Sequence, residues 1–268
     1  MKKVIIILIL FIFFLCSCSN NKLSITKQII PDEFKKNISN YNSYDHQYLH
    51  QYYYYYLDYN SMIYALNMVN YPTFYDTETK MKAISVNKTI LVNRKFYLEP
   101  DYVPNNLTPV KDVKYVKRLN EVMLLDQEAL EMYQKMEKVA KQNNVDLLLF
   151  SSYRSYEKQL SLWDKNRSIN DLYLALPGYS EHQTGLAIDI GTEVSGLTLA
   201  FENTKAFKFL KNEAYKFGFI LRYPKGKSDI TGYAYEPWHF RYVGENIAKI
   251  IWQKNLTLEE YFYQYLEL

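Results

Sequence analysis

The apolar and polar positions in the second half of the chain change from a helical period to a strand period and back. Residues 126–142 place apolar side chains every three or four positions, which predicts an amphipathic helix behind the N-cap Asp126. The stripe is formed by Leu130, Tyr133, Met136 and Ala140. VDLLLFSS (145–152) then predicts a buried strand, and Ser155 is placed to cap a further helix that runs through Lys165.

The run GLAIDIG (185–191) alternates like a strand. Its apolar residues Leu186, Ile188 and Ile190 share one face, so the carboxylate of Asp189 faces the other way. A buried carboxylate is costly unless it is paired, hydrogen-bonded or bound to a metal. Asp189 is therefore either a well-satisfied structural residue or part of a metal site.

The last third of the chain continues this mixture of helices and strands. Residues 203–217 predict a helix closed by Gly218 as its C-cap, and Thr257 with Glu260 predicts a capping box at the start of a last helix. Two more strands are predicted at FILRYP (219–224) and EPWHFRYVG (236–244). Helices and strands that alternate in this way predict an α+β domain, with a small, mostly antiparallel sheet flanked by helices.

The first residues follow a different pattern. Lys2 and Lys3 precede an unbroken apolar run at positions 4–15, which indicates a secretory signal because the run is too short for a comfortable membrane span. LCSC (15–18) resembles the signal of bacterial lipoproteins, in which Cys18 is lipidated and becomes the first mature residue; plain secretion is the alternative. We expect a lipoprotein signal peptide at 1–17 and a polar tether at 18–40.

Residues 41–84 are rich in tyrosine and have a helix-like pattern. His46 and His50 are one turn apart, but no third ligand of suitable type lies nearby, so we expect surface or packed histidines. The tyrosines favour a half-buried packing face, and a sugar-stacking surface or separate binding module stays open. Residues 85–107 predict a short strand and an extended segment, at the start of a main domain that spans 85–268.

Composition adds little to this organisation. The 268 residues are 48% hydrophobic and 23% charged, as in an ordinary globular protein. Cleavage before Cys18 removes Lys2 and Lys3 and lowers the formal charge from +3 to +1, which gives no argument for a nucleic-acid partner. Both cysteines, Cys16 and Cys18, lie in the signal region, so no disulfide is available to the domain.

Two of the four histidines, His182 and His239, lie in the unusual stretches SEHQTGLAIDI and EPWHF. With Asp189 they would supply two nitrogen ligands and one oxygen ligand, the number that a catalytic zinc site takes from the protein. Glu236 would then be free to act as a base. The HExxH pattern of many metallopeptidases is absent, so the spacing alone leaves the structural alternative open.

Nucleophile-based schemes fit the chain less well. SYEK (155–158) matches the S-x-x-K of serine DD-peptidases, but SNNK (19–22) matches it equally and no S-D-N or K-T-G accompanies either. The sequence contains no G-x-S-x-G, P-loop or dinucleotide fingerprint.

Three blocks taken together resemble the zinc D-alanyl-D-alanine carboxypeptidases of the VanY type. They are SSYRSYEKQ (151–159), PGYSEHQTGLAIDIG (177–191) and ITGYAYEPWHFRYVG (230–244), in the family's order, and the resemblance covers roughly 85–255. It implies a zinc DD-peptidase (hedgehog-like) fold. It also implies one Zn²⁺ per chain, held by His182, Asp189 and His239, with Glu236 as the general base.

The same resemblance implies a set of substrate contacts. Arg154 would bind the free C-terminal carboxylate of a peptide, since its planar guanidinium matches a carboxylate bidentately, and Gln159 would help to hold that group. Ser180 and Trp238 would touch the substrate. The residues alone leave Arg154 as a salt-bridge residue and Trp238 as a core residue among the alternatives.

Three further charged residues lie in or near these blocks. We expect Arg222 and Arg241 to be mainly structural, and Glu181 to be solvated or to orient its neighbours, because Asp189 already supplies the oxygen ligand.

Together with the N-terminal lipoprotein signal, the resemblance predicts a lipid-anchored enzyme at the extracytoplasmic face of the bacterial cell membrane. It would remove the terminal D-alanine from peptidoglycan stem peptides or their lipid-linked precursors. The alternatives are an LD-carboxypeptidase acting on tetrapeptide stems, a peptidoglycan endopeptidase, and a non-catalytic wall-binding lipoprotein. The sequence leaves the oligomeric state open.

Overall fold

The computed structural model describes residues 30–40, 46, 49, 52, 81–86, 89–119, 121–166 and 172–265. The chain divides into two compact units, Met1–Pro72 and Thr73–Leu268. In the first unit, helix α2 (Asp32–Ile38) buries Phe34 and Ile38, and His46 is exposed. Within the described ranges, no helix is both long and apolar enough to span a membrane.

Most of the predicted N-terminal organisation falls outside those ranges. The signal peptide, Cys18 and His50 are not among the described residues, and neither is most of the tyrosine-rich region. The predicted boundaries after residues 17, 40 and 84 therefore stay predictions.

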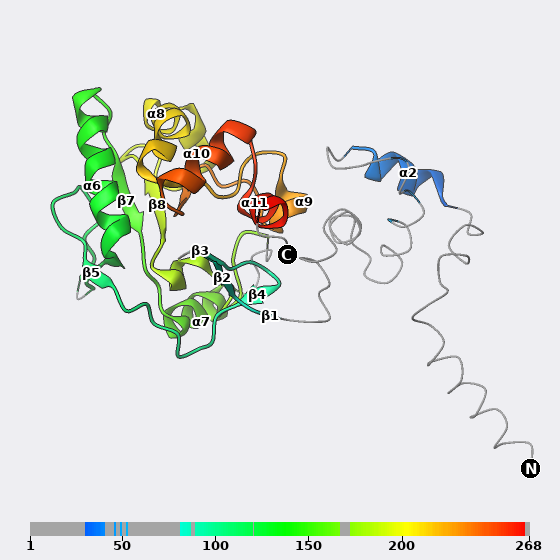
Figure 1. Cartoon of the computed structure of the whole chain (residues 1–268), viewed down its shortest axis with the longest axis horizontal. Helices are drawn as coiled ribbons and strands as arrows, with labels where there is room; N and C mark the ends of the chain where they lie inside the picture. Colours follow the sequence, from blue (N-terminus) through cyan, green and yellow to red (C-terminus); the bar gives the residue numbers. More distant parts are fainter. Residues whose placement is uncertain are drawn as a thin grey trace, which may run out of the picture. The chain divides into compact units, whose positions relative to one another are not determined.

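A four-stranded antiparallel sheet forms the centre of the second unit (Figure 1). Its strands lie in the order β7 (Leu148–Ser151), β8 (Ala187–Gly191), β10 (His239–Tyr242) and β9 (Phe219–Leu221). All three neighbouring pairs are antiparallel. This confirms the predicted α+β class with an antiparallel sheet.

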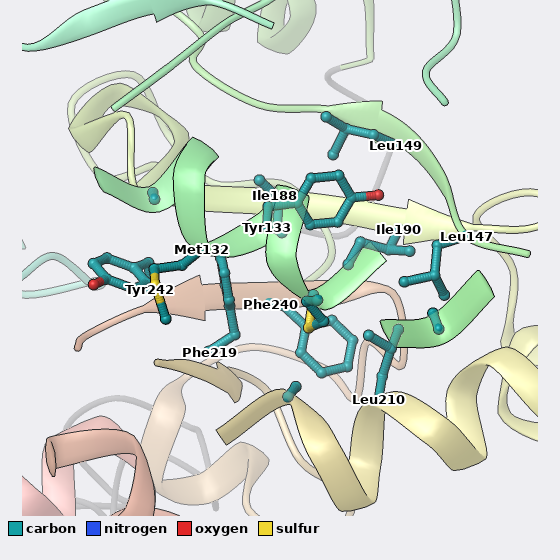
Figure 2. Close-up of a cluster of buried hydrophobic side chains, with 14 of the residues drawn as sticks. Met132, Tyr133, Leu147, Leu149, Ile188, Ile190, Leu210, Phe219, Phe240 and Tyr242 are labelled. Carbon is teal, nitrogen blue, oxygen red and sulfur yellow. The ribbon is translucent and has the colours of Figure 1, made fainter. Parts of the chain in front are cut away.

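Helices cover one face of this sheet and form the main hydrophobic core with it. They are α6 (Gln127–Gln142), α8 (Lys205–Glu213) and the 3₁₀ helices η5 (Leu199–Asn203) and η6 (Ala214–Phe217). Figure 2 shows Ile188 and Ile190 of β8 among the buried side chains of this core, with Tyr133 of α6 beside them. The alternation predicted for the GLAIDIG strand is confirmed, because Ile188 and Ile190 lie in this core and are fully buried.

The helices begin at the capping residues that the sequence predicts. The Asp126 carboxylate accepts hydrogen bonds from the backbone N–H groups of Glu128 and Ala129 at the start of α6. Ser155 accepts one from the N–H of Lys158 at the start of α7 (Tyr156–Lys165). The predicted capping box of α11 (Leu258–Tyr265) is confirmed, since the backbone N–H groups of Thr257 and Glu260 donate to each other's side chains at 2.7 and 3.1 Å.

The helix predicted over 203–217 is wrong in its extent. Thr204 caps α8, which ends at Glu213, and the tighter turns of η6 lead to Gly218. Gly218 has φ of 77°, and a Cβ there would lie 2.5 Å from Cε2 of Tyr242, so the glycine ends the helix as expected. Because apolar side chains recur at similar spacings in α and 3₁₀ helices, the sequence pattern does not show where α8 gives way to the 3₁₀ helix η6.

Short strand pairs replace the single strand predicted near residue 85. The antiparallel pairs are β2 (Ile84–Val86) with β3 (Thr89–Leu91), and β5 (Leu107–Pro109) with β6 (Leu124–Asp126). The parallel pair is β1 (Met81–Lys82) with β4 (Phe96–Tyr97). The remaining elements are η4 (Glu181–Thr184), α9 (Ser228–Thr231) and α10 (Glu245–Lys254).

Candidate active site

The register of two central strands brings together residues that are fifty positions apart. His239 of β10 lies directly opposite Asp189 of β8, and the next pair in register is Phe240 with Ile188. Because successive residues face opposite sides of a sheet, Phe240 and Ile188 enter the core while His239 and Asp189 occupy the other face. There, Nδ1 of His239 lies 3.1 Å from Oδ1 of Asp189.

His182 of η4 lies beside Asp189 as well. Gly185 ends this 3₁₀ helix with φ of 70°, and the chain then enters β8, the strand that carries Asp189. Its Nδ1 contacts the carbonyl oxygen of Ser152 at 2.6 Å, and its Nε2 lies 3.2 Å from Oδ2 of Asp189. Since a carbonyl can only accept, Nδ1 is the donor, and Nε2 keeps a lone pair directed at the carboxylate side.

The donor atoms of His182, Asp189 and His239 fit a metal ion. The three residues are buried, and one ligand atom from each lies within 4.8 Å of the other two. Ligand atoms at about 2.0–2.2 Å from a tetrahedral zinc lie roughly 3.3–3.6 Å apart. Each imidazole lies close to that distance from one oxygen of Asp189, His182 at 3.2 Å from Oδ2 and His239 at 3.1 Å from Oδ1. The Oδ1 atom of Asp189 is buried without a hydrogen-bond donor among the described residues, as a ligand oxygen would be.

Glu236 lies beside these residues. Its Oε2 is 3.7 Å from Nδ1 of His239, and burial raises the pKa of Glu236 to about 7. Burial lowers the pKa of His182. Burial acts in the same direction on His239, but its contacts with Asp189 and Glu181 outweigh it and raise the pKa of His239 to about 9.

All four residues line one cavity of about 250 Å³. The expected substrate contacts Arg154, Gln159, Ser180 and Trp238 line it as well. Ser180 is buried. Trp238 is half-buried; it lines this cavity and also packs against the main core, so its position fits both a substrate contact and a core residue. A second cavity of about 380 Å³ shares Arg154 and Asp189 with the first and adds Arg118, Glu121 and Lys158.

Gln159 holds Arg154. The guanidinium NH1 of Arg154 donates to Oε1 of Gln159 at 2.7 Å, and its NH2 donates to Oγ of Ser151 at 3.4 Å. The amide nitrogen of Gln159 donates in turn to the carbonyl of Ala175 at 2.5 Å. Gln159 therefore orients the guanidinium, and its contact with a substrate carboxylate stays a prediction.

Of the two expectations for Glu181, solvation is wrong, which leaves the expectation that it orients its neighbours. Its carboxylate is fully buried and forms ion pairs with Arg222 at 2.7 Å and Arg241 at 2.9 Å, which confirms both arginines as structural residues. These pairs outweigh the cost of burial and hold the pKa of Glu181 well below its usual range. Sequence reasoning missed Glu259, which binds Arg222 from α11, because nothing local in the sequence links these two positions.

Several known proteins are similar to this chain. The VanY family model, described as D-alanyl-D-alanine carboxypeptidase, matches residues 122–245. YodJ of Bacillus subtilis (strain 168) is 42% identical over 184 residues, which are 66% of this chain and 67% of YodJ. The chain belongs to the VanY family. A D-alanyl-D-alanine carboxypeptidase of Enterococcus faecium is 33% identical over 64% of this chain, and the match spans 56% of that enzyme.

Two solved structures share the fold. The LdcB LD-carboxypeptidase has a TM-score of 0.61 and 37% identity, over 69% of this chain and 94% of that one. A VanY D,D-pentapeptidase mutant from a VanB-type resistance cassette, in complex with Zn(II), has a TM-score of 0.53 and 33% identity, over 65% of this chain and 97% of that one. The predicted fold and the predicted class of enzyme, a hydrolase of the carboxypeptidase type, are confirmed.

Proposed function

We propose that this chain is a zinc-dependent carboxypeptidase that removes the C-terminal D-alanine from peptidoglycan stem peptides. The observation that carries the proposal is that one cavity is lined by a zinc-type ligand set, a carboxylate of raised pKa and a guanidinium. These are the groups that hydrolysis next to a free carboxylate requires.

The ligand set His182, Asp189 and His239 would hold the ion. When bound, zinc supplies a water of lowered pKa and polarises the scissile carbonyl. Glu236 takes the proton from the attacking water and returns it to the leaving amine. Burial raises the pKa of Glu236 in the metal-free protein, and a buried carboxylate holds a proton between the two steps more readily than an exposed one.

Arg154 supports exopeptidase action. Its guanidinium is aimed by Gln159 and Ser151 and lines the same cavity as the ligand set. A terminal carboxylate bound there would place the last peptide bond at the reacting centre. An internal peptide bond offers no carboxylate to Arg154, which argues against an endopeptidase.

An LD-carboxypeptidase acting on tetrapeptide stems is the second candidate. The LdcB LD-carboxypeptidase has a higher TM-score and identity to this chain than the VanY D,D-pentapeptidase. Both enzymes would use the same ligand set, base and arginine and would release a terminal D-alanine; they differ in the stem that they shorten, a tetrapeptide or a pentapeptide. A non-catalytic wall-binding protein has no chemical reason to keep a buried acid of raised pKa beside three ligands.

The cell envelope is the proposed location. The N-terminal lysines, the apolar run at 4–15 and the cysteine at 18 support a lipid anchor at the extracytoplasmic face of the membrane. Labelling of cells with a fatty acid analogue tests this, because Cys18→Ala should abolish the label and release the protein from the membrane. A variant that is still labelled would contradict the anchor.

A substrate panel tests the activity. The chain from residue 19 is incubated with zinc and with synthetic pentapeptide, tetrapeptide and cross-linked stems, and the products are identified by mass spectrometry. We expect the pentapeptide to lose one alanine. Cleavage of the tetrapeptide alone would establish LD specificity, cleavage of only the cross-linked stem would establish an endopeptidase, and no cleavage of any stem would contradict the proposed function.

A further inference from the structure

The two ring nitrogens of His239 face different partners. Nδ1 faces the carboxylates of Asp189 and Glu236 at 3.1 and 3.7 Å, on the side where the ion would be held. Nε2 faces Oε2 of Glu181 at 3.5 Å on the opposite side of the ring. Both Nε2 of His239 and Oε2 of Glu181 are buried, and neither has a hydrogen-bond partner within the described part of the chain.

The ion pairs of Glu181 leave its Oε2 atom available to the imidazole of His239. Both arginines bind the other oxygen, Oε1, which accepts from Nε of Arg222 at 2.7 Å and from NH1 of Arg241 at 2.9 Å. An ion pair that served only to neutralise charge could use either oxygen. Here the two guanidinium groups fix the carboxylate by one atom and leave Oε2 directed at the imidazole.

A second layer of contacts holds the arginines in place. Arg241 also donates to the carbonyl groups of Tyr242 and Ile90. Arg222 donates from NH1 and NH2 to Glu259 at 2.8 and 2.6 Å, so that α11 is tied to the site. The network contains two carboxylates and two guanidinium groups and is neutral as a whole, which is how a fully buried set of charges is tolerated.

We propose that Glu181 is a positioning residue for His239. Oε2 of Glu181 faces Nε2 of His239 at 3.5 Å, and with an ion on Nδ1 it would accept the Nε2–H, which would keep the lone pair on Nδ1 and set the ring plane for the metal. A ligand histidine generally needs such an acceptor on its second nitrogen, and its loss typically costs 10–100-fold in metal affinity. The Ser152 carbonyl does the same for His182, on the opposite ring nitrogen.

This inference rests on the proposed zinc site, and it is tested by zinc affinity. Glu181→Leu removes both acceptor oxygens, which glutamine would not, but alone it would leave a net buried positive charge. The test therefore uses Glu181→Leu with Arg241→Met, which keeps the network neutral. The matched control is Glu259→Leu with Arg222→Met, which also removes one acid and one base but leaves Glu181 paired with Arg241. Zinc dissociation constants of the full-length chain are measured by competition with a chromophoric chelator, and folding is followed by circular dichroism.

We expect the Glu181 variant to bind zinc 10–100-fold more weakly than the wild type, and the control to stay within a few-fold of it. Equal affinities in the two double variants would overturn the role of Glu181. Failure of the wild type to bind zinc would instead overturn the proposed function, so the two failures are distinct.

A measurement on the wild type covers the case in which the Glu181 variant does not fold. In the zinc-loaded protein labelled with ¹⁵N-histidine, nuclear magnetic resonance should show a protonated Nε2 and a metal-bound Nδ1 for His239. His182 should show the opposite arrangement and serves as the internal control. An unprotonated Nε2 on His239 would overturn the inference without any substitution.

Discussion

Replacement of Arg154 by methionine tests how the enzyme selects the end of a peptide. The guanidinium has five N–H donors, and its contacts with Gln159 and Ser151 use two of them. Three donors remain, enough for a bidentate pair with a terminal carboxylate. Methionine keeps much of the length of the side chain but removes every donor, so the change isolates the carboxylate contact.

The size of the effect follows from those two lost bonds. A hydrogen bond to a charged group contributes about 1.5–3 kcal/mol. Two of them stabilise the bound peptide and its transition state by roughly 3–6 kcal/mol, and each 1.36 kcal/mol is a tenfold change in rate. We therefore expect kcat/KM for a free stem peptide to fall by about 10²–10⁴-fold. Arg154→Lys, which offers one point contact, should lie in between.

The assay compares each stem peptide with its C-terminal amide. The amide offers no carboxylate, so Arg154→Met should barely change its already slow hydrolysis. Arg118→Met is the matched control, since Arg118 lines the adjoining cavity and is half-exposed, with a 3.8 Å pair to Glu121. Such a pair contributes at most about 1 kcal/mol, and activity should change by no more than roughly fivefold. An equal loss on the acid and on the amide in Arg154→Met would refute the reasoning.

Three further predictions concern the base, the metal and the fold. Glu236→Gln should lower kcat by about 10²–10⁴-fold and leave zinc content unchanged, as metal analysis and D-alanine release would show; a variant with full activity would rule Glu236 out as the base. His239, with a pKa of about 9 in the metal-free protein, must lose its proton to bind a metal, so zinc affinity should rise about tenfold per pH unit from pH 7 towards 9. Calorimetry in buffers of different ionisation enthalpy would detect the released proton, and a zinc affinity that does not change between pH 7 and 9 would contradict the prediction. Gly218→Ala should lower the free energy of unfolding in urea by about 1–3 kcal/mol, because the new Cβ meets Tyr242 at a positive φ. Gly196→Ala, where nothing lies within 4 Å of the new Cβ, should cost less, and equal losses would exclude the steric cause.

Local sequence signals predicted the parts of the fold that depend on nearby residues. The N-cap Asp126, the alternation of β8 and the capping box of α11 each involve residues within a few positions of one another, and each is confirmed. The break between α8 and η6 could not be predicted in this way. An amphipathic stripe specifies which face is buried, whereas the tighter winding before Gly218 depends on how the chain packs near Tyr242.

The candidate site was predicted in its members but not in its geometry. The motif blocks supplied His182, Asp189 and His239, yet their approach depends on the register of β8 and β10, which is set by hydrogen bonds between distant segments. The network behind them was beyond sequence reasoning altogether. Arg222 lies 41 positions from Glu181 and 37 from Glu259, and no periodic or spacing rule connects residues at such distances.

Zinc add-back to the stripped enzyme tests the central claim most directly. The chain is freed of metal with a chelator, titrated with zinc, and assayed for D-alanine released from a pentapeptide stem. We predict no activity without metal and a linear rise that stops at one zinc per chain, with no rise at stoichiometric zinc in His239→Ala. Undiminished release by the metal-free wild type, or full activity of His239→Ala, would contradict a zinc carboxypeptidase built on this site.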